Sequence, residues 1–179
     1  MKLHVTGYFL NATYANDAGR VIYKVKSPSL VSGSTTISRV LPADINIPRR
    51  NSDANNDSQE RFAHLARIDW GVQSTSIHLL DQTMETRQFL RREPKFLSRN
   101  RIFIAPDGKE YKWILGAHTS QLILYDGKDT VTHVAKYHRG NLGITSEKRK
   151  GALEIYPAGE HMVDLILVTF LFIEKARRS

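Results

Sequence analysis

The chain has 179 residues, no cysteine, 41% hydrophobic and 25% charged residues, and a formal net charge of +8. This length fits one domain, and the absence of cysteine excludes disulfides, thiol nucleophiles and cysteine-based zinc sites. No apolar run approaches the roughly 18–20 residues that a membrane-spanning helix needs, and polar residues interrupt the first apolar stretch too often for a secretory signal. We therefore expect a single intracellular domain over residues 1–179, cytoplasmic or peripheral at a membrane.

The positive charge is unevenly distributed along the chain. Residues 1–50 carry seven Lys/Arg and two Asp/Glu (+5), residues 51–85 carry two and six (−4), and residues 86–179 carry seventeen and ten (+7). A basic excess attracts polyanions such as nucleic acid or anionic lipid, and it also occurs as a solvated surface that keeps a protein soluble.

Short β-branched and aromatic segments, separated by turn residues, predict a series of strands. In chain order they are residues 21–25, 62–70, 76–80, 86–90, 101–104, 111–115, 122–125 and 131–137. The clearest signal is a hairpin in which Pro106-Asp107-Gly108 joins the fifth and sixth of these segments, because Asp-Gly tolerates the backbone of tight turns. In residues 62–70, alternation places Phe62, His64, Ala66, Ile68 and Trp70 on the face toward the core. Strands at intervals of 8–12 residues predict an antiparallel sandwich or barrel.

Two segments depart from this pattern. Residues 48–60 contain almost nothing to bury and predict a mobile polar loop between strands. Residues 162–173 contain ten apolar side chains among twelve, which would surround a helix and require burial on every side. Periodicity alone leaves a buried helix and a buried strand open for this segment.

Four ordered segments carry a resemblance to a known family. Residues 101–113 are similar to an R-x-F-x-x-x-D-G-x-x-Y-x-W pattern, residues 134–138 to a V-A-x-Y-H strand, and residues 65–70 to an A-x-I-x-W strand. Residues 161–178 resemble the closing segment of the same family. Over residues 20–178 the chain thus resembles a family of short uncharacterised proteins of basidiomycete fungi, related to the tubby and LURP-one group and more distantly to phospholipid scramblases.

The resemblance implies a fold and a class of ligand. The implied fold is a mainly β, tubby-like closed antiparallel barrel of about twelve strands with the C-terminal apolar helix through its centre. On this basis residues 162–173 form a helix, with Asp164 near the rim, where backbone N–H groups of the first turn can meet its carboxylate. Tubby-like domains bind phosphoinositides, so the resemblance also implies an anionic phospholipid as the ligand.

The residues themselves give little support for an enzyme. The chain has no nucleophile elbow, zinc-protease helix, P-loop or dinucleotide-binding glycine pattern. Its seven histidines are scattered, and Asp107 and Asp126 each precede a turn glycine, which favours a turn role over a calcium site. We expect no catalytic residues, no metal site and no cofactor.

The strongest candidate for a functional site is a run of six cations between residues 87 and 101, opposed only by Glu93 and interleaved with Phe89, Leu90, Phe96 and Leu97. Such a segment can hold anionic headgroups by charge while apolar residues enter the membrane interface. The alternative is that the phenylalanines and leucines are core residues and the arginines only face water. A second basic patch follows near residue 148. The candidate lipid-binding residues are Arg87, Arg91, Arg92, Lys95, Arg99, Lys148, Arg149 and Lys150.

Two functions are favoured on the sequence alone, ahead of lipid scrambling, which the resemblance to scramblases suggests but for which the sequence shows neither a membrane span nor a cysteine to palmitoylate. The first is a non-enzymatic module that binds anionic phospholipid at a membrane surface. The second is an adaptor or structural domain whose partner is another protein. Nucleic acid is disfavoured because no recognition-helix or RNP-type motif is present. The sequence does not define an oligomeric state.

Overall fold

The computed structural model describes residues 1–28, 33–41, 61–71, 73–127, 131–140 and 150–179. The described residues form thirteen strands: β1 (Lys2–Tyr8), β2 (Asn11–Ala15), β3 (Val21–Lys26), β4 (Gly33–Val40), β5 (Phe62–Trp70), β6 (Thr75–Leu79), β7 (Gln82–Glu85), β8 (Arg91–Arg92), β9 (Arg101–Ile104), β10 (Glu110–Leu115), β11 (Ser120–Leu124), β12 (His133–His138) and β13 (Gly151–Ile155). Three helical segments complete them: α2 (Thr86–Phe89), the 3-10 helix η1 (Pro157–Met162) and α3 (Val163–Arg178). The predicted segment 48–60 lies outside the described residues.

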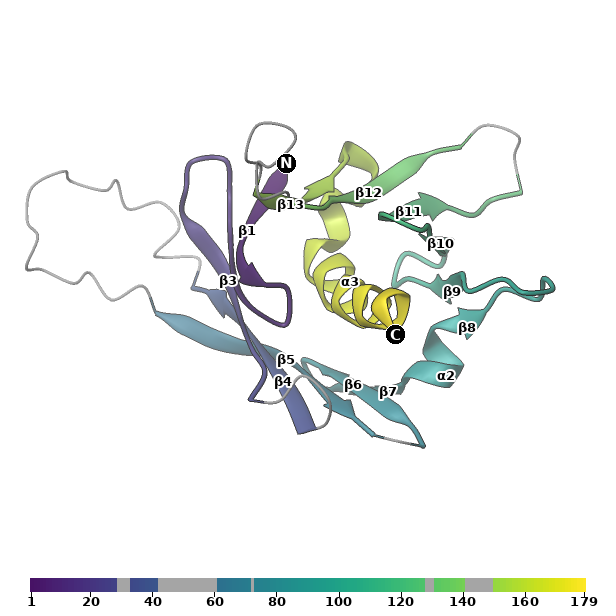
Figure 1. Cartoon of the computed structure of the whole chain (residues 1–179), viewed down its shortest axis with the longest axis horizontal. Coiled ribbons are helices and arrows are strands. Elements are labelled where there is room, and N and C mark those ends of the chain that lie inside the picture. Colours follow the sequence, from purple (N-terminus) through teal and green to yellow (C-terminus); the bar gives the residue numbers. More distant parts are fainter. Residues whose placement is uncertain (29–32, 42–60, 72, 128–130, 141–149) are drawn as a thin grey trace, which may run out of the picture.

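All thirteen strands belong to one antiparallel sheet that curves around α3 (Figure 1). Its order is β7-β6-β5-β4-β3-β2-β1-β13-β12-β11-β10-β9-β8, so strands that pair are consecutive in the chain, except for the pair β1 and β13. The antiparallel, mainly β architecture with a C-terminal helix is therefore confirmed.

The predicted closure of the barrel is wrong, because β7 and β8 are the two edges of the sheet and are not paired with each other. Residues 86–90 were predicted as a strand, but Thr86–Phe89 form the single helical turn α2 between these edges and Leu90 caps it. The next strand, β8, has only two residues and pairs only with β9. The seam of the sheet is thus filled by a helical turn and not by strand pairing.

The apolar helix α3 packs against the inner face of the sheet. All its residues from Leu165 to Leu171 are buried, which explains why its sequence is apolar on every side. The indole N–H of Trp113 donates to Thr169 Oγ1 at 3.1 Å, and the rings of Trp113 and Tyr137 lie 6.3 and 4.8 Å from that of Phe170. The inner face of β10 and β12 is thereby fixed against the helix.

The first turn of α3 is held by side chains of the sheet. Asp164 lies there as expected, but its carboxylate accepts hydrogen bonds from Tyr23 Oη at 2.5 Å and Arg39 Nη1 at 2.7 Å instead of from the backbone of the helix. Burial, and then the carboxylate, raise the pKa of Tyr23, so the phenol remains the proton donor.

The predicted core face of β5 is correct only for part of the strand. Ala66 and Ile68 are buried, but Leu65 is buried as well and His64 is exposed. The pairing of β4 with β5 shifts register between Ile37 and Ser38, so the extra residue reverses the alternation beyond that point.

Within the described residues, no helix combines the length and the apolar character needed to cross a bilayer.

Candidate functional site

The end of α3 meets several loops at one end of the sheet. Because neighbouring strands are antiparallel, the β1–β2, β8–β9 and β10–β11 connections emerge at the same end. The guanidinium of Arg178 lies 4.6 Å from the ring centroid of Phe9, Arg177 Nη1 donates to Ala117 O at 2.9 Å, and Arg99 Nη2 donates to Ala176 O. We call this surface the C-terminal rim and define it by residues 8–10, 93–100, 116–119 and 175–179.

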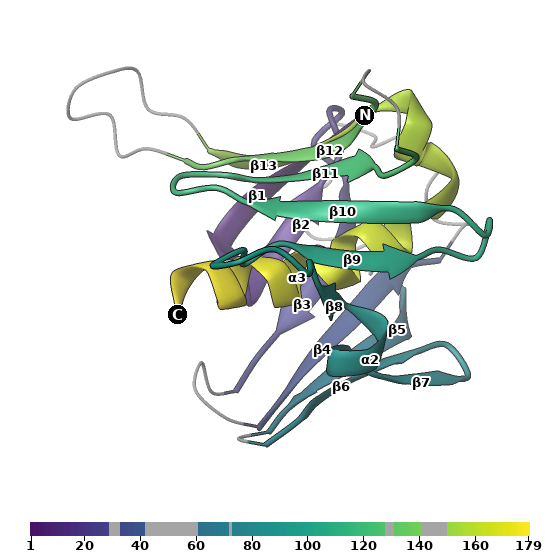
Figure 2. The same cartoon turned by 90° about the vertical axis from the view of Figure 1, so that its right-hand side faces the viewer.

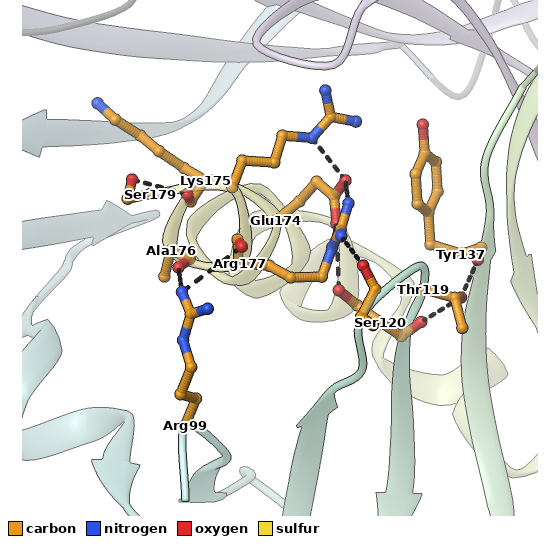
Figure 3. Close-up of polar contacts among 11 residues, drawn as sticks. Arg99, Thr119, Ser120, Tyr137, Glu174, Lys175, Ala176, Arg177 and Ser179 are labelled. Carbon is orange, nitrogen blue, oxygen red and sulfur yellow. Dashed lines mark hydrogen bonds and ion pairs between the residues drawn. The ribbon is translucent and has the colours of Figure 1, made fainter. Parts of the chain in front are cut away.

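A fully buried carboxylate organises the rim (Figure 3). Glu174 accepts hydrogen bonds from Arg177 Nε and Nη2 at 2.8 and 2.6 Å, from Arg178 Nε at 2.8 Å and from Ser120 Oγ at 3.1 Å. Burial is the largest single influence and by itself would raise the pKa of Glu174, but the hydrogen bonds and the charges of Arg177 and Arg178 together outweigh it and lower the pKa. The charge of Glu174 therefore compensates part of the positive charge of Arg177 and Arg178, which leaves less of it to attract an anionic ligand.

Arg99 ties the β8–β9 loop to the end of the helix. Its guanidinium donates to the carbonyl of Ala176 and, at 3.5 Å, to that of Arg177. These carbonyls belong to the negative end of the helix dipole, where a cation is stabilising. Figure 2 shows the C-terminal end of α3 beside the connection between β8 and β9.

The β8–β9 loop, residues 93–100, has a defined conformation built around one carboxylate. Glu93 accepts hydrogen bonds from Ser98 Oγ at 2.7 Å, Asn100 Nδ2 at 2.8 Å and Lys112 Nζ at 3.3 Å. The hydrogen bond from Ser98 is the largest cause of the lowered pKa of Glu93. The one acid in the basic segment is thus engaged within the loop.

At the tip of this loop two large apolar side chains face solvent. Phe96 is 90% exposed and Leu97 is 84% exposed, and Leu97 adopts a positive φ of 58°. Exposed cations, Lys95 and Arg99, flank the pair in the chain. The interleaved apolar residues of the sequence therefore divide into two groups, because Phe89 packs against the core and Leu90 is 2% exposed.

The structure brings only some of the candidate lipid-binding residues together. Arg91 and Arg92 are successive strand residues and point to opposite faces, and Arg91 forms an ion pair with Glu110 at 2.7 Å. Arg87 is exposed on α2, away from the loop tip in sequence and in a different element. Lys150 is exposed directly before β13, at the same end of the strands as the β8–β9 loop. Two further candidates, Lys148 and Arg149, lie outside the described residues.

Sequence reasoning missed the role of Glu174. The signal that could have revealed it is the spacing to Arg177 and Arg178, since residues three and four apart are neighbours on a helix. In the described part of the chain, no three acidic or histidine side chains gather closely enough to hold a metal ion.

The fold and this surface define a mainly β protein with a curved sheet around a buried helix and a basic rim that carries an exposed apolar loop tip. The chain belongs to a family of unknown function, DUF6593, whose family model matches residues 8–179. No curated protein and no solved structure matches it.

Proposed function

We propose that the protein is a non-enzymatic module that binds anionic phospholipid, phosphoinositides included, at a membrane surface through its β8–β9 loop. The observation that carries the proposal is the exposure of Phe96 and Leu97 at the tip of a basic loop. The resemblance to the tubby group supports the same class of ligand, and the binding needs no cofactor or metal.

The loop has the features of a small membrane anchor. Removing a Phe and a Leu side chain from water stabilises the bound state by about 1.5–3 kcal/mol each. Each cation near an anionic membrane adds about 1 kcal/mol. Lys95 is beside the apolar pair in sequence, and Arg92 and Lys150 are exposed at the same end of the strands. Two side chains and a few cations give reversible, salt-dependent binding.

Defined loop structure also favours binding. The side chain of Glu93 joins both ends of the loop through Ser98 and Asn100, and Arg99 docks it on α3. A loop already ordered before binding loses less conformational entropy on binding than a disordered one.

Vesicle co-sedimentation tests the proposal. Wild-type protein is mixed with phosphatidylcholine vesicles alone, with added phosphatidylserine, and with added phosphoinositide, across a salt series. We expect binding only to the anionic vesicles, weakening as salt rises. Phe96→Ser with Leu97→Ser should abolish it, and Arg92→Glu with Lys95→Glu should reduce it at least tenfold.

The chain offers a matched control in Leu80. It is 77% exposed with a φ of 52°, close to the values for Leu97, but it lies in the β6–β7 turn at the other end of the strands. Leu80→Ser should leave vesicle binding unchanged. Wild-type protein that ignores anionic vesicles even at low salt would reject the lipid function, and the exposed Phe96–Leu97 pair would then favour the protein-adaptor role.

A further inference from the structure

A pair of arginines lies on the inner face of the sheet beside the C-terminal rim. Arg92 of β8 and Arg101 of β9 are directly opposite each other in the antiparallel register. Arg101 is also opposite Trp113 of β10, and Trp113 packs against α3. Because residues opposite each other in a sheet share a face, both arginines lie on the face that holds the helix.

Among the residues that the structure describes, these two guanidinium groups have no carboxylate partner, unlike other arginines of the protein. Arg91, Arg39 and Arg177 each have a carboxylate within 2.7 Å. Among the described residues, Arg101 Nη1 is shielded from solvent and has no hydrogen-bond partner. Like charges directly opposite each other in a sheet are destabilising, and an unpaired buried donor is a further cost.

A third arginine adds to the excess. Burial is the largest cause of the lowered pKa of Arg101, and the charges of Arg92 and then Arg99 lower it further. The negative end of the α3 dipole does not account for the positions of Arg92 and Arg101, because its last carbonyls already accept hydrogen bonds from Arg99. Three guanidinium groups therefore lie close enough to influence one another, and within the described residues neither Arg92 nor Arg101 forms an ion pair with a carboxylate.

We propose that Arg92 and Arg101, with the charge of Arg99, form a binding site for a phosphate group. A guanidinium presents a planar fork of N–H donors that matches phosphate oxygens in a bidentate way. A phosphate would supply the missing acceptor for Arg101 Nη1 and neutralise the cross-strand pair. The phosphate can belong to a lipid headgroup or to a soluble molecule; only the lipid source rests on the proposed function.

Soluble probes test the site apart from any membrane. Inositol trisphosphate and inorganic phosphate are titrated into the full chain by calorimetry at constant ionic strength, and the melting temperature is followed in parallel. We expect the affinity for inositol trisphosphate to fall at least tenfold in Arg101→Gln and in Arg92→Gln. The control Lys26→Gln removes one charge from an exposed position at the end of β3 and should bind as the wild type does.

The stability of the variants provides an independent readout. In phosphate-free buffer Arg101→Gln should melt at the same temperature as the wild type or higher, because it removes a half-buried guanidinium whose shielded Nη1 has no hydrogen-bond partner among the described residues. The rise in melting temperature that inositol trisphosphate gives the wild type should be smaller in this variant at the same ligand concentration, because the stabilisation by a ligand falls as its dissociation constant rises.

The outcomes separate this site from the membrane function. Equal affinity of wild type and Arg101→Gln for inositol trisphosphate, or no binding by either, would overturn the site even if vesicles bind. Soluble binding that depends on Arg101, without vesicle binding, would retain the site and identify a soluble phosphate as its ligand. Soluble binding that persists in Phe96→Ser with Leu97→Ser, while vesicle binding is lost, would support both proposals.

Discussion

The substitution Glu174→Gln tests how much the buried carboxylate stabilises the C-terminal rim. The change keeps the size and shape of the side chain but removes its charge, while Arg177, whose side chain is 7% exposed, and Arg178 keep theirs. Breaking a buried ion pair from one side costs about 3–5 kcal/mol. Arg177 retains its hydrogen bond to Ala117 O, and Arg178 is 28% exposed, so we expect the lower end of this range, about 3 kcal/mol.

Urea unfolding followed by circular dichroism measures this loss. In a domain of this size, about 3 kcal/mol corresponds to a fall in melting temperature of roughly 6–12 °C. The matched control is Glu160→Gln, since Glu160 is 54% exposed and pairs with the amino group of Met1 at 3.6 Å, a contact that contributes at most about 1 kcal/mol. If Glu174→Gln lost less than about 1 kcal/mol, the buried network would not be what holds the end of α3.

Three further predictions follow from the fold. Leu167→Arg should yield no soluble, cooperatively melting protein, because Leu167 is 0% exposed and the charge would be buried without a partner; a cooperative melt would contradict the burial of α3. Gly7→Ala should destabilise by more than about 1 kcal/mol in urea unfolding, because Gly7 has a φ of 106° and the added Cβ would lie 2.6 Å from Asn11 O. The hydrogen bond with His138 is the largest cause of the lowered pKa of Glu154. The ionised Glu154 should therefore stabilise the folded protein above its ordinary pKa of 4.5, and this stabilisation should be lost as the pH falls through the lowered pKa. In a plot of the free energy of unfolding against pH, His138→Gln should reduce the fall in stability over this acidic range.

The sequence predicted those parts of the fold that depend on local chemistry. The β9–β10 hairpin forms around Gly108, which has a φ of 78°, and Asp107 stabilises the turn by accepting from Lys109 N at 3.1 Å and Tyr111 Oη at 2.7 Å. The all-round apolar pattern also predicted complete burial of the segment that forms α3. Its helical state came from the family resemblance, since a buried strand has the same composition.

Features that depend on distant pairing could not be predicted in the same way. Residues 86–90 have strand-like composition, but the first four of them form α2, which connects two sheet edges that are not paired with each other. The extra residue in β5 is visible only in its register with β4. For the candidate site, the composition of the sequence identified the basic segment. Only the pairing of β8 with β9 shows that Arg91 and Arg92 lie on opposite faces of the sheet and that Arg101 lies on the same face as Arg92.

The order of the elements along the chain has a consequence for synthesis. The pairing of β1 with β13 joins residues about 150 positions apart, and α3 follows every strand that it covers. A ribosome therefore releases the whole inner surface of the sheet before residues 163–178, which will cover it, have been made. Until then the nascent strands can form hairpins but not a closed core, so the cooperative folding step must wait for the helix. Loss of α3 should consequently leave a chain with exposed apolar strands that is prone to aggregate, and not a smaller folded domain.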